Sequence, residues 1–498
     1  MKSQNTSKVR CRADRLGIQG GLLFGGLLLG FLLLATPARA TGIPAPVLRA
    51  LSTAQIPAEN VSIVVQAVEA RQAQIAHRPR QVMNPASVMK LVTTYAALDL
   101  LGPAWVWKTS IWADADAVDG QLNGNLYIRG SGDPRLAIEH LWSLLRQVRT
   151  RGIRQVNGDI VLDHGVFALP AFDPGRFDDK PMRPYNVGPE GLLINFRAIR
   201  FTLRPGNGSP QIIQETPNEN LLIDNRLQGA TQECGNDWKD RIQTRLIAER
   251  DRQRLEFSGS YSLLCGERSL NLAPLPSEQH ADGLIRSLWR ELGGSLGGRV
   301  RSGPVAIASQ RLVEHESEPL ANAVRDINKF SNNVMARQLF LTLGNDTAPA
   351  TIERARERMG AWLLGRGLNF PELVIDNGSG LSRSERISAD SLNRLLLDAW
   401  QHPAMPEFIA SLPIVGIDGT MKRRLKGSEV TGRAHIKTGT LEGVRTAAGY
   451  ALDASGRRYA VTMLINHPKA QAGGAAIDAL LLWLAQRTSS DLSSSARD

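Results

Sequence analysis

The sequence predicts an α/β protein whose catalytic domain is interrupted by a β-rich insertion. Strand-like apolar runs occur near the start, at 62–68, and again near the end, at 446–451 and 459–465. Between 275 and 402, apolar residues recur with helical spacing. Between 108 and 274 the pattern changes to short alternating runs separated by turn residues. A sheet that gathers early and late segments, surrounded by helices, fits the first two observations, and an inserted module fits the third.

The first forty residues are expected to be a secretory signal peptide and not part of the fold. Lys and Arg residues precede an apolar run at 20–35, and Ala38-Arg39-Ala40 has the spacing of a signal-peptidase site. An uncleaved membrane anchor is the alternative, but this run is shorter than the roughly 20 residues that a span needs. We therefore expect an exported, periplasmic protein with at most peripheral association with the membrane.

The net charge of +11 does not indicate a nucleic-acid partner. The leader holds six basic residues and one acidic residue, so its removal lowers the net charge by five. The remaining basic residues are spread among acidic ones. The densest cluster, Lys422-Arg423-Arg424, most simply lies on an exposed helix face, and attraction to an anionic cell-wall polymer is the alternative. The mature chain is therefore expected to have an ordinary solvated surface.

Two cysteines remain after the leader, since Cys11 lies within it. In an exported chain, Cys234 and Cys265 most simply form one disulfide, which would staple the inserted module. The eight histidines are scattered and no H-E-x-x-H motif occurs, so no metal site is expected. No other cofactor is implied.

The expected elements follow in order along the chain. The catalytic domain begins with the strand at 62–68 and a helix over 87–101, which Pro85 precedes. The insertion contains one amphipathic helix, at 138–151. Its short strands are expected at 122–129, 156–162, 198–203, 254–257 and 261–264. Helices are then expected at 279–292, 319–327, 332–343, 348–366 and 388–402, followed by three closing strands and a last helix at 473–486.

The first chemical motif is Ser87-Val88-Met89-Lys90, which puts a serine and a lysine on one face of a helix start. A serine hydroxyl is a poor nucleophile at neutral pH and needs a base at hydrogen-bond distance. Lys90 can serve as that base if burial or a second cation lowers its pKa, and Lys437 would supply the cation. The motif is weak evidence alone, because the same spacing arises by chance on exposed helices.

The second motif is Ser331-Asn332-Asn333, in a segment that opens a helix. Ser331 could relay a proton to a leaving amine, or it could simply cap the helix, and both roles can hold together. Asn333 could donate a hydrogen bond to a substrate amide.

The third motif is Lys437-Thr438-Gly439. Lys437 and Thr438 suit a terminal carboxylate as a charge and a donor, and Gly439 lets a backbone come close to the substrate. The N–H of Thr440, beside that of Ser87, could form an oxyanion hole. A surface hairpin with a lysine is the plain alternative, and the coincidence of three motifs in order argues against it.

In this chain order the three motifs are the signature of penicillin-binding proteins and serine β-lactamases. The sequence resembles the low-molecular-mass class C (type-4) penicillin-binding proteins, the D-alanyl-D-alanine carboxypeptidase/endopeptidase family (peptidase family S13). Further similarity to that family lies at 130–134, 376–383 and 412–420. Ser87 and Ser331 are 244 positions apart, a gap that in this family holds two β-rich modules, one nested in the other.

The resemblance implies a penicillin-binding/β-lactamase-like transpeptidase domain, with helices around an antiparallel sheet. This domain would comprise residues 41–107 and 275–498, with 108–274 as the inserted modules and 1–40 as the leader. The implied activity is a periplasmic serine-type D-Ala-D-Ala carboxypeptidase that also acts as a DD-endopeptidase. Its partners would be peptidoglycan stem peptides and cross-links, with β-lactam antibiotics as covalent inhibitors.

The resemblance also implies a role for each motif residue. The penultimate D-Ala carbonyl, or a β-lactam, would acylate Ser87, and Lys90 would be the general base. In the family, an acidic residue of the insertion helps to bind the free amino end of the stem-peptide diamino acid. Asp179 is the residue to which this role carries over, although the nearby 183–186 segment departs from the usual aromatic pattern of the family.

Two other functions stay open at this point. A serine β-lactamase of class A needs a deacylating glutamate, and the segment at 190–195 is faintly similar to one, although its spacing is wrong. A non-catalytic cell-wall-binding or penicillin-sensing protein on the same scaffold is the second alternative. Intact motifs disfavour it, and so does the lack of an evident transmembrane segment after the leader.

Overall fold

The computed structural model describes residues 42–250 and 252–488. The predicted leader, residues 1–40, lies outside the described residues. Within the described ranges, no helix has both the length and the apolar character that crossing a bilayer requires.

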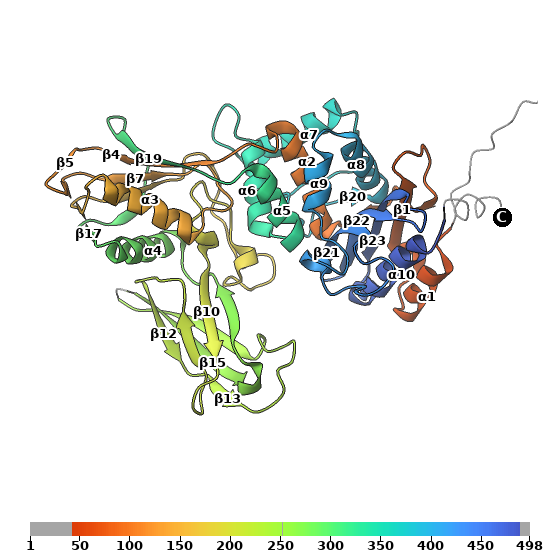
Figure 1. The fold of residues 1–498 in the computed structure, drawn as a ribbon, viewed down its shortest axis with the longest axis horizontal. Helices are drawn as coiled ribbons and strands as arrows, with labels where there is room; N and C mark the ends of the chain where they lie inside the picture. Colours follow the sequence, from red (N-terminus) through yellow and green to blue (C-terminus); the bar gives the residue numbers. More distant parts are fainter. Residues whose placement is uncertain (1–41, 251, 489–498) are drawn as a thin grey trace, which may run out of the picture. The chain divides into compact units, whose positions relative to one another are not determined.

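A five-stranded antiparallel sheet forms the centre of the catalytic domain, in the order β2-β1-β23-β22-β21 (Figure 1). Its strands are β1 (Val61–Ala67), β2 (Ile75–His77), β21 (Ala434–Leu441), β22 (Val444–Leu452) and β23 (Arg458–Asn466). Strand β1 pairs with β23 along its whole length, from Val61 opposite Ile465 to Ala67 opposite Tyr459. The early and late segments therefore share one sheet, as the apolar pattern predicted.

Helices cover both faces of this sheet, so its strands are buried on both sides. Helices α1 (Ala45–Thr53) and α10 (Gly474–Ala485) pack against each other and against one face. The other face is covered by α2 (Lys90–Leu101), α5 (Leu320–Phe330), α6 (Asn333–Leu343), α7 (Ile352–Gly365), α8 (Ala389–Gln401) and α9 (Met405–Ser411). Strand alternation divides the two cores: Ile63 and Val65 join the α1–α10 core, whereas Val64 joins the α2 core.

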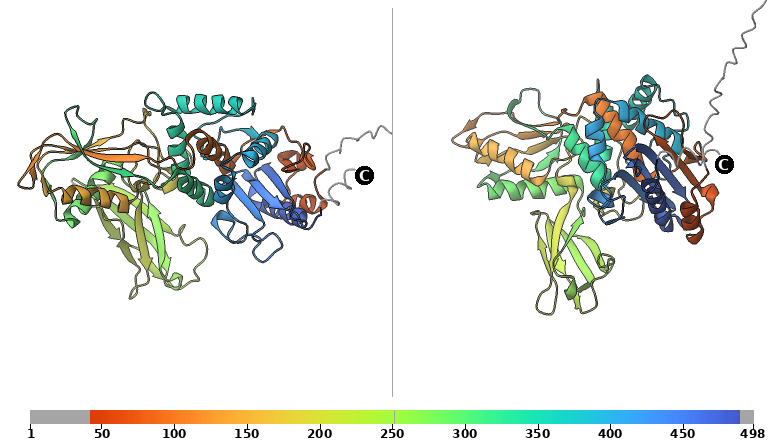
Figure 2. Two further views of the ribbon diagram at one scale, coloured as in Figure 1. Left: turned by 45° about the horizontal axis from the view of Figure 1, so that its top comes forward. Right: turned by 45° about the vertical axis from the view of Figure 1, so that its right-hand side comes forward.

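The outer part of the insertion is built from two small sheets and two helices (Figure 2). One sheet has the order β18-β9-β7-β4-β19 and the other β17-β8-β6-β5. Their strands before residue 164 are β4 (Lys108–Ala113), β5 (Ala117–Val118), β6 (Gln121–Leu122), β7 (Leu126–Arg129), β8 (Gln155–Val156) and β9 (Ile160–Asp163). The later strands are β17 (Ser295–Leu296), β18 (Val300–Ser302) and β19 (Gln310–Glu316). Helices α3 (Ile138–Thr150) and α4 (Ser277–Glu291) share one apolar core with these sheets.

The inner part of the insertion lies between β9 and α4 in the chain and has its own core. Its strands are β10 (Ile199–Arg204), β11 (Gln211–Gln214), β12 (Leu221–Asn225), β13 (Gln228–Ala230), β14 (Ile242–Ala248), β15 (Gln253–Ser262) and β16 (Arg268–Leu272). Cys234 and Cys265 are joined by a disulfide, the pairing expected from the two cysteines of the mature chain. The bond ties the segment before β14 to the end of β15.

The pairing of the strands changes where we draw the end of the insertion. A boundary at 274 would assign α4 and strands β17 to β19 to the catalytic domain. Yet β18 pairs with β9 and β19 pairs with β4, so the residues up to about 316 complete sheets that begin at residue 108. We therefore propose an outer module of 108–163 and 277–316, with the inner module of 199–272 nested within it. The sequence alone favours the earlier boundary at 274, because α4 has the same helical spacing as the helices of the catalytic domain.

Candidate active site

Ser87 lies in a tight turn that leads into α2. The predicted helix over 87–101 begins as a 3-10 turn, η2 (Ala86–Met89), and becomes α-helical at Lys90. Ala86 has a φ of +46° and is buried, which sets the direction in which the turn leaves Pro85. Asn84 accepts a hydrogen bond from the Ala86 N–H at 2.8 Å, and Thr446 on β22 donates its hydroxyl to the Pro85 carbonyl at 2.8 Å. The nucleophile turn is therefore held by the sheet and is not a freely moving loop.

Lys90 is fully buried beneath Ser87, and its Nζ has three oxygen partners. Ser87 Oγ lies 3.1 Å away and Asn333 Oδ1 2.6 Å away, and the third partner is the Ser379 carbonyl. Burial lowers the pKa of Lys90 well below its ordinary value, and the nearby charge of Lys437 lowers it further. The structure thus provides both conditions for a neutral lysine.

All three partners of Lys90 can also be satisfied when the amine is neutral. An uncharged –NH2 group has two N–H donors and one lone pair. The Asn333 amide oxygen and the Ser379 carbonyl can only accept, so they take the two donors. The lone pair is then left for the Ser87 hydroxyl, which can donate. Chemically, such an arrangement can activate a serine hydroxyl as a nucleophile.

Ser331 sits at the junction of two helices, where α5 ends and α6 begins. It has a left-handed backbone with φ +55°, an uncommon conformation for a residue with a side chain. The cap of α6 is Asn332, whose side chain accepts from the Met335 N–H at 3.1 Å. Ser331 is therefore not the N-cap, and its hydroxyl is free for another role.

Lys437 on β21 is fully buried and points its Nζ at Ser331 Oγ, 2.9 Å away. It also donates to the Thr438 carbonyl at 2.7 Å. Burial lowers the pKa of Lys437 to about 7, so a modest change in its surroundings moves its proton on or off near neutral pH. The second and third motifs therefore meet at one hydrogen bond.

Gly439 lets β21 run against the nucleophile turn. A Cβ at this position would lie 2.2 Å from Thr446 Oγ1 and 2.9 Å from the Ser87 nitrogen, so any side chain would push the strand away. Thr440 follows on the same strand, and its side chain accepts from Arg445 at 2.7 Å. The strand edge that carries Thr440 is thus fixed beside the backbone nitrogen of Ser87.

The segment at 412–420 forms a wall next to Thr438. Lys329, at the end of α5, is buried and donates to the Leu412 carbonyl and to Asp418, both at 2.7 Å. These two hydrogen bonds anchor the segment to Lys329, which lies two residues before Ser331. The hydroxyl of Thr420 then lies 3.0 Å from that of Thr438. Thr420 is a site residue that sequence reasoning missed, although the segment itself was noted for its similarity to the family.

The loop that carries Asp179 reaches the edge of the site through Phe177. Phe177 packs against Ala86, Leu381, Leu441 and Val444, which surround the nucleophile turn and the end of β21. Asp178 is occupied, because Tyr185 Oη and Asn186 Nδ2 both donate to it, at 2.8 and 2.7 Å.

Asp179 itself is exposed. Within the part of the chain that the structure describes, its carboxylate has no hydrogen bond or ion pair. It lines a cavity of about 230 Å³ whose walls also include Lys239 and Thr244 of the inner module. The structure therefore brings Phe177 to the edge of the site, and within the described residues Asp179 makes no hydrogen bond to the three motifs.

Two features of the loop at 376–385 were not foreseen. In the sequence, residues 376–383 stood out only for their similarity to the family. The structure shows that its Ser379 carbonyl is a direct partner of Lys90. Strand β20 (Ile387–Ser388), which follows the loop, pairs with β3 (Val82–Met83), just before the nucleophile turn. A backbone carbonyl has no sequence signature, so only the density of turn-forming residues could have pointed to it.

Glu190, the faint counterpart of a deacylating glutamate, uses its carboxylate for hydrogen bonds to Arg197 and Ser277. One of its carboxylate oxygens accepts from Arg197 at 3.1 Å and the other from the Ser277 hydroxyl at 2.5 Å. Both partners belong to the insertion and its flank. Nothing in these contacts favours a β-lactamase role for this residue.

Comparisons with known proteins agree with this geometry. The chain is 25% identical over 82% of its length to a D-alanyl-D-alanine carboxypeptidase of Haemophilus influenzae, covering 85% of that protein. It is 28% identical over 81% of its length to a D-alanyl-D-alanine carboxypeptidase of an Actinomadura species, covering 77% of it. The crystal structure of penicillin-binding protein 4 from Haemophilus influenzae superposes with a TM-score of 0.73 at 24% identity, over 89% of this chain and 99% of the other.

The sequence model of one peptidase family matches residues 46–487, nearly all of the described chain. The fold is that of penicillin-binding protein 4, with α and β elements in several sheets. The chain therefore belongs to the D-Ala-D-Ala carboxypeptidase 3 (S13) family of penicillin-binding proteins.

Proposed function

We propose that this D-Ala-D-Ala carboxypeptidase works through an acyl-enzyme formed on Ser87. Ser87 Oγ attacks the carbonyl carbon of the penultimate D-Ala, and its proton passes to the Lys90 amine. The observation that carries the proposal is the fully buried Lys90 Nζ, 3.1 Å from Ser87 Oγ, with two acceptors for its N–H bonds. A base that is neutral at the working pH is what this step requires.

The leaving amine must receive a proton as the C–N bond breaks. Ser331 is suited to relay it, because its hydroxyl lies 2.9 Å from Lys437 Nζ and makes no cap hydrogen bond. As Ser331 gives its proton to the amine it is reprotonated from Lys437, and the proton that Lys90 took from Ser87 makes good that loss. D-Ala then departs, and a water molecule attacks the ester carbonyl. The oxygen of the water stays on the acyl carbon, which leaves as the carboxylic acid of the shortened peptide, and its proton passes through Lys90 to Ser87 Oγ, which restores the hydroxyl. Asn333 uses its amide oxygen for Lys90, which leaves its –NH2 to donate to the substrate amide.

The terminal carboxylate of the substrate fits the edge of β21. Lys437 supplies a positive charge, and the hydroxyls of Thr438 and Thr420 are neighbouring donors, 3.0 Å apart. The N–H groups of Ser87 and Thr440 would stabilise the negative charge that develops on the attacked oxygen. Substrate binding would also raise the pKa of Lys437, since a carboxylate favours the charged form.

Asp179 is our candidate for the free amino group of the stem-peptide diamino acid. Its carboxylate is exposed, and Phe177, two residues earlier, packs beside the nucleophile turn. Asp179→Asn should lower kcat/KM for a stem peptide with a free side-chain amine about tenfold, and leave an N-acetylated peptide unaffected, since one exposed ion pair is at stake. Asp178→Asn is the matched control, because Asp178 already binds Tyr185 and Asn186. Equal losses on both peptides would reject Asp179.

The substrates that we propose are peptidoglycan stem peptides and, in endopeptidase action, their cross-links. The exported, periplasmic location is part of the same proposal. The test is release of D-Ala from a stem pentapeptide by the purified protein, with Ser87→Ala as the control. Release that depends on Ser87 supports the proposal. A well-folded protein that releases no D-Ala, or a Ser87→Ala variant that releases it normally, contradicts it.

A further inference from the structure

Glu385 is a fully buried carboxylate that gathers three consecutive backbone N–H groups. Its Oε1 accepts from Asp376 at 3.2 Å and from Asn377 and Gly378 at 3.0 Å each. Its Oε2 is buried and has no hydrogen-bond partner among the described residues. A buried carboxylate is costly unless it is well bonded, so this residue does specific structural work in the loop.

The loop that Glu385 holds, residues 376–380, is in direct contact with the turn at 86–90 and with Thr93. The Ser379 carbonyl accepts from Lys90 Nζ, and the Gly378 carbonyl accepts from the Thr93 hydroxyl at 2.6 Å. Gly380 has a φ of +80°, and a Cβ there would lie 2.0 Å from the Ala86 carbonyl oxygen. A shift of this loop would therefore move an acceptor that fixes the base.

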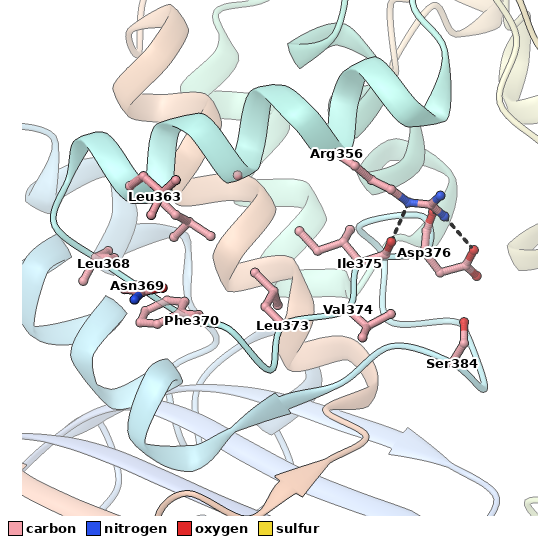
Figure 3. A pocket seen from close by; sticks show the side chains of 12 residues that line it. Arg356, Leu363, Leu368, Asn369, Phe370, Leu373, Val374, Ile375, Asp376 and Ser384 are labelled. Atoms are coloured by element: carbon pink, nitrogen blue, oxygen red, sulfur yellow. Dashed lines mark hydrogen bonds and ion pairs between the residues drawn. The ribbon is translucent and has the colours of Figure 1, made fainter.

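The outer side of the same loop is fastened by Arg356 of α7 (Figure 3). Its guanidinium donates to the Ile375 carbonyl at 2.6 Å and to the Asp376 carbonyl at 3.0 Å, beside a cavity of about 550 Å³. Arg356 is partly exposed, whereas Glu385 is fully buried and lies on the side of Lys90. The inner fastening is thus the one that can act on the base.

Four charged groups face Glu385 or Lys90 from the surrounding elements. They are Lys90 itself on α2, Arg337 on α6, Asp376 in the loop and Lys437 on β21. The charge of Glu385 raises the pKa of Lys90, whereas Lys437 and Arg337 lower it. Burial raises the pKa of Glu385, and its three N–H partners oppose this by favouring the charged form.

We propose that Glu385 is a positioning residue for acylation: its carboxylate holds the loop at 376–380 so that the Ser379 carbonyl aims the Lys90 amine at Ser87. The proposal rests on the function proposed above. In this proposal Glu385 contributes to acylation in two ways that can be tested separately. The acceptor oxygen of Glu385 fixes the loop, and the negative charge of Glu385 acts on the proton affinity of Lys90.

Two substitutions separate the contributions. Glu385→Gln keeps an oxygen that can accept the three N–H groups and removes the charge, whereas Glu385→Ala removes both. Glu372→Gln is the matched control. Glu372 also holds backbone, accepting from the Ser388 N–H at 3.1 Å and the Ser391 hydroxyl at 2.6 Å, but within the described residues it makes no hydrogen bond to the loop at 376–380.

The measurement is the second-order rate constant of acylation by a fluorescent penicillin, taken from pH 5 to pH 9. For Glu385→Ala we expect a loss of about 100-fold at every pH, the usual consequence of a misplaced catalytic group. For Glu385→Gln we expect a rate within tenfold of wild type at the optimum, and an acidic limb shifted to lower pH by about one unit. Glu372→Gln should follow the wild-type curve.

The results that would overturn the proposal are equally definite. A Glu385→Gln variant with the wild-type acidic limb refutes the effect of charge, and this holds even if Glu385→Ala does not fold. A folded Glu385→Ala variant with wild-type rates refutes the positioning role. Failure of the wild type itself to become acylated would instead reject the proposed function, so the two failures are distinguishable.

Discussion

Replacing Lys437 by methionine should stabilise the folded protein while it abolishes turnover. Lys437 is fully buried, and within the described residues no carboxylate forms an ion pair with it. Its only hydrogen bonds there are to Ser331 and to the Thr438 carbonyl. Methionine has a similar shape and no charge to bury, so the variant removes a destabilising group that catalysis needs.

The magnitude follows from the lowered pKa. Lys437 falls from 10.5 to about 7, and at about 1.4 kcal/mol per unit this lowers the free energy of unfolding by about 5 kcal/mol. The unfolded chain binds more protons between pH 7 and 10.5, so the stability of the wild type rises with pH in that window and is level below it. Methionine also loses two hydrogen bonds, worth about 1 kcal/mol each. The net gain is then about 3 kcal/mol at pH 6.

The decisive observable is how that gain changes with pH. At pH 9.5, close to the ordinary pKa of lysine, only a small part of the cost remains, so the advantage of the variant should shrink by about 3 kcal/mol relative to pH 6. In a chain of this size the change corresponds to about 5 °C in the difference between the two Tm values. Lys90 contributes in the same direction, because losing Lys437 raises its pKa.

The assay is thermal unfolding of the wild type and Lys437→Met at pH 6 and 9.5. Lys422→Met, which changes an exposed lysine, is the control and should leave the pH dependence unchanged. A Lys437→Met variant that is less stable than the wild type at pH 6, or whose Tm difference is the same at both pH values, would refute the buried-charge argument.

The remaining predictions concern catalysis and the insertion. In a pH profile of kcat/KM on a stem peptide, activity should fall as the pH rises through about 7, because Lys437 of the free enzyme loses its proton there. Lys437→Arg should move this basic limb to higher pH, since arginine stays charged. A basic limb that the substitution leaves unchanged would contradict the assignment. Replacing Cys234 and Cys265 by alanine opens a loop with a sequence separation of 31, so the inner module should lose about 4 kcal/mol of stability while penicillin acylation stays normal. Loss of acylation at a temperature where the module remains folded would show that the module acts on the site directly.

The central sheet and the three motifs could be predicted because each depends on a short, local sequence pattern. Strands β1, β22 and β23 are mainly apolar, as is typical of strands that are buried on both faces. Ser87, Ser331 and Lys437 were identified from short motifs. In the structure, a hydrogen bond from Lys90 to Asn333 joins the first motif to the second, and one from Lys437 to Ser331 joins the third to the second. The residue types of the site could thus be predicted from the sequence, whereas their contacts required the structure.

The contributions that escaped prediction come from backbone atoms and from pairing at a distance. The Ser379 carbonyl and the three N–H groups on Glu385 carry no residue-type signal. The sequence does not indicate where the insertion ends, because α4 has helical spacing like any other helix. Only the pairing of β18 with β9 shows to which sheet the strands after α4 belong. The left-handed backbone of Ser331 likewise follows from the meeting of two helices and not from its own identity.

The central claim is that Ser87, activated by Lys90, forms a covalent acyl-enzyme. The most direct measurement is mass spectrometry of the protein after exposure to benzylpenicillin, followed by tryptic mapping of the peptide at 81–90, which ends at Lys90. We predict one adduct per chain, located on Ser87 and absent from Ser87→Ala. An adduct on another residue, or one that persists in Ser87→Ala, would contradict the account.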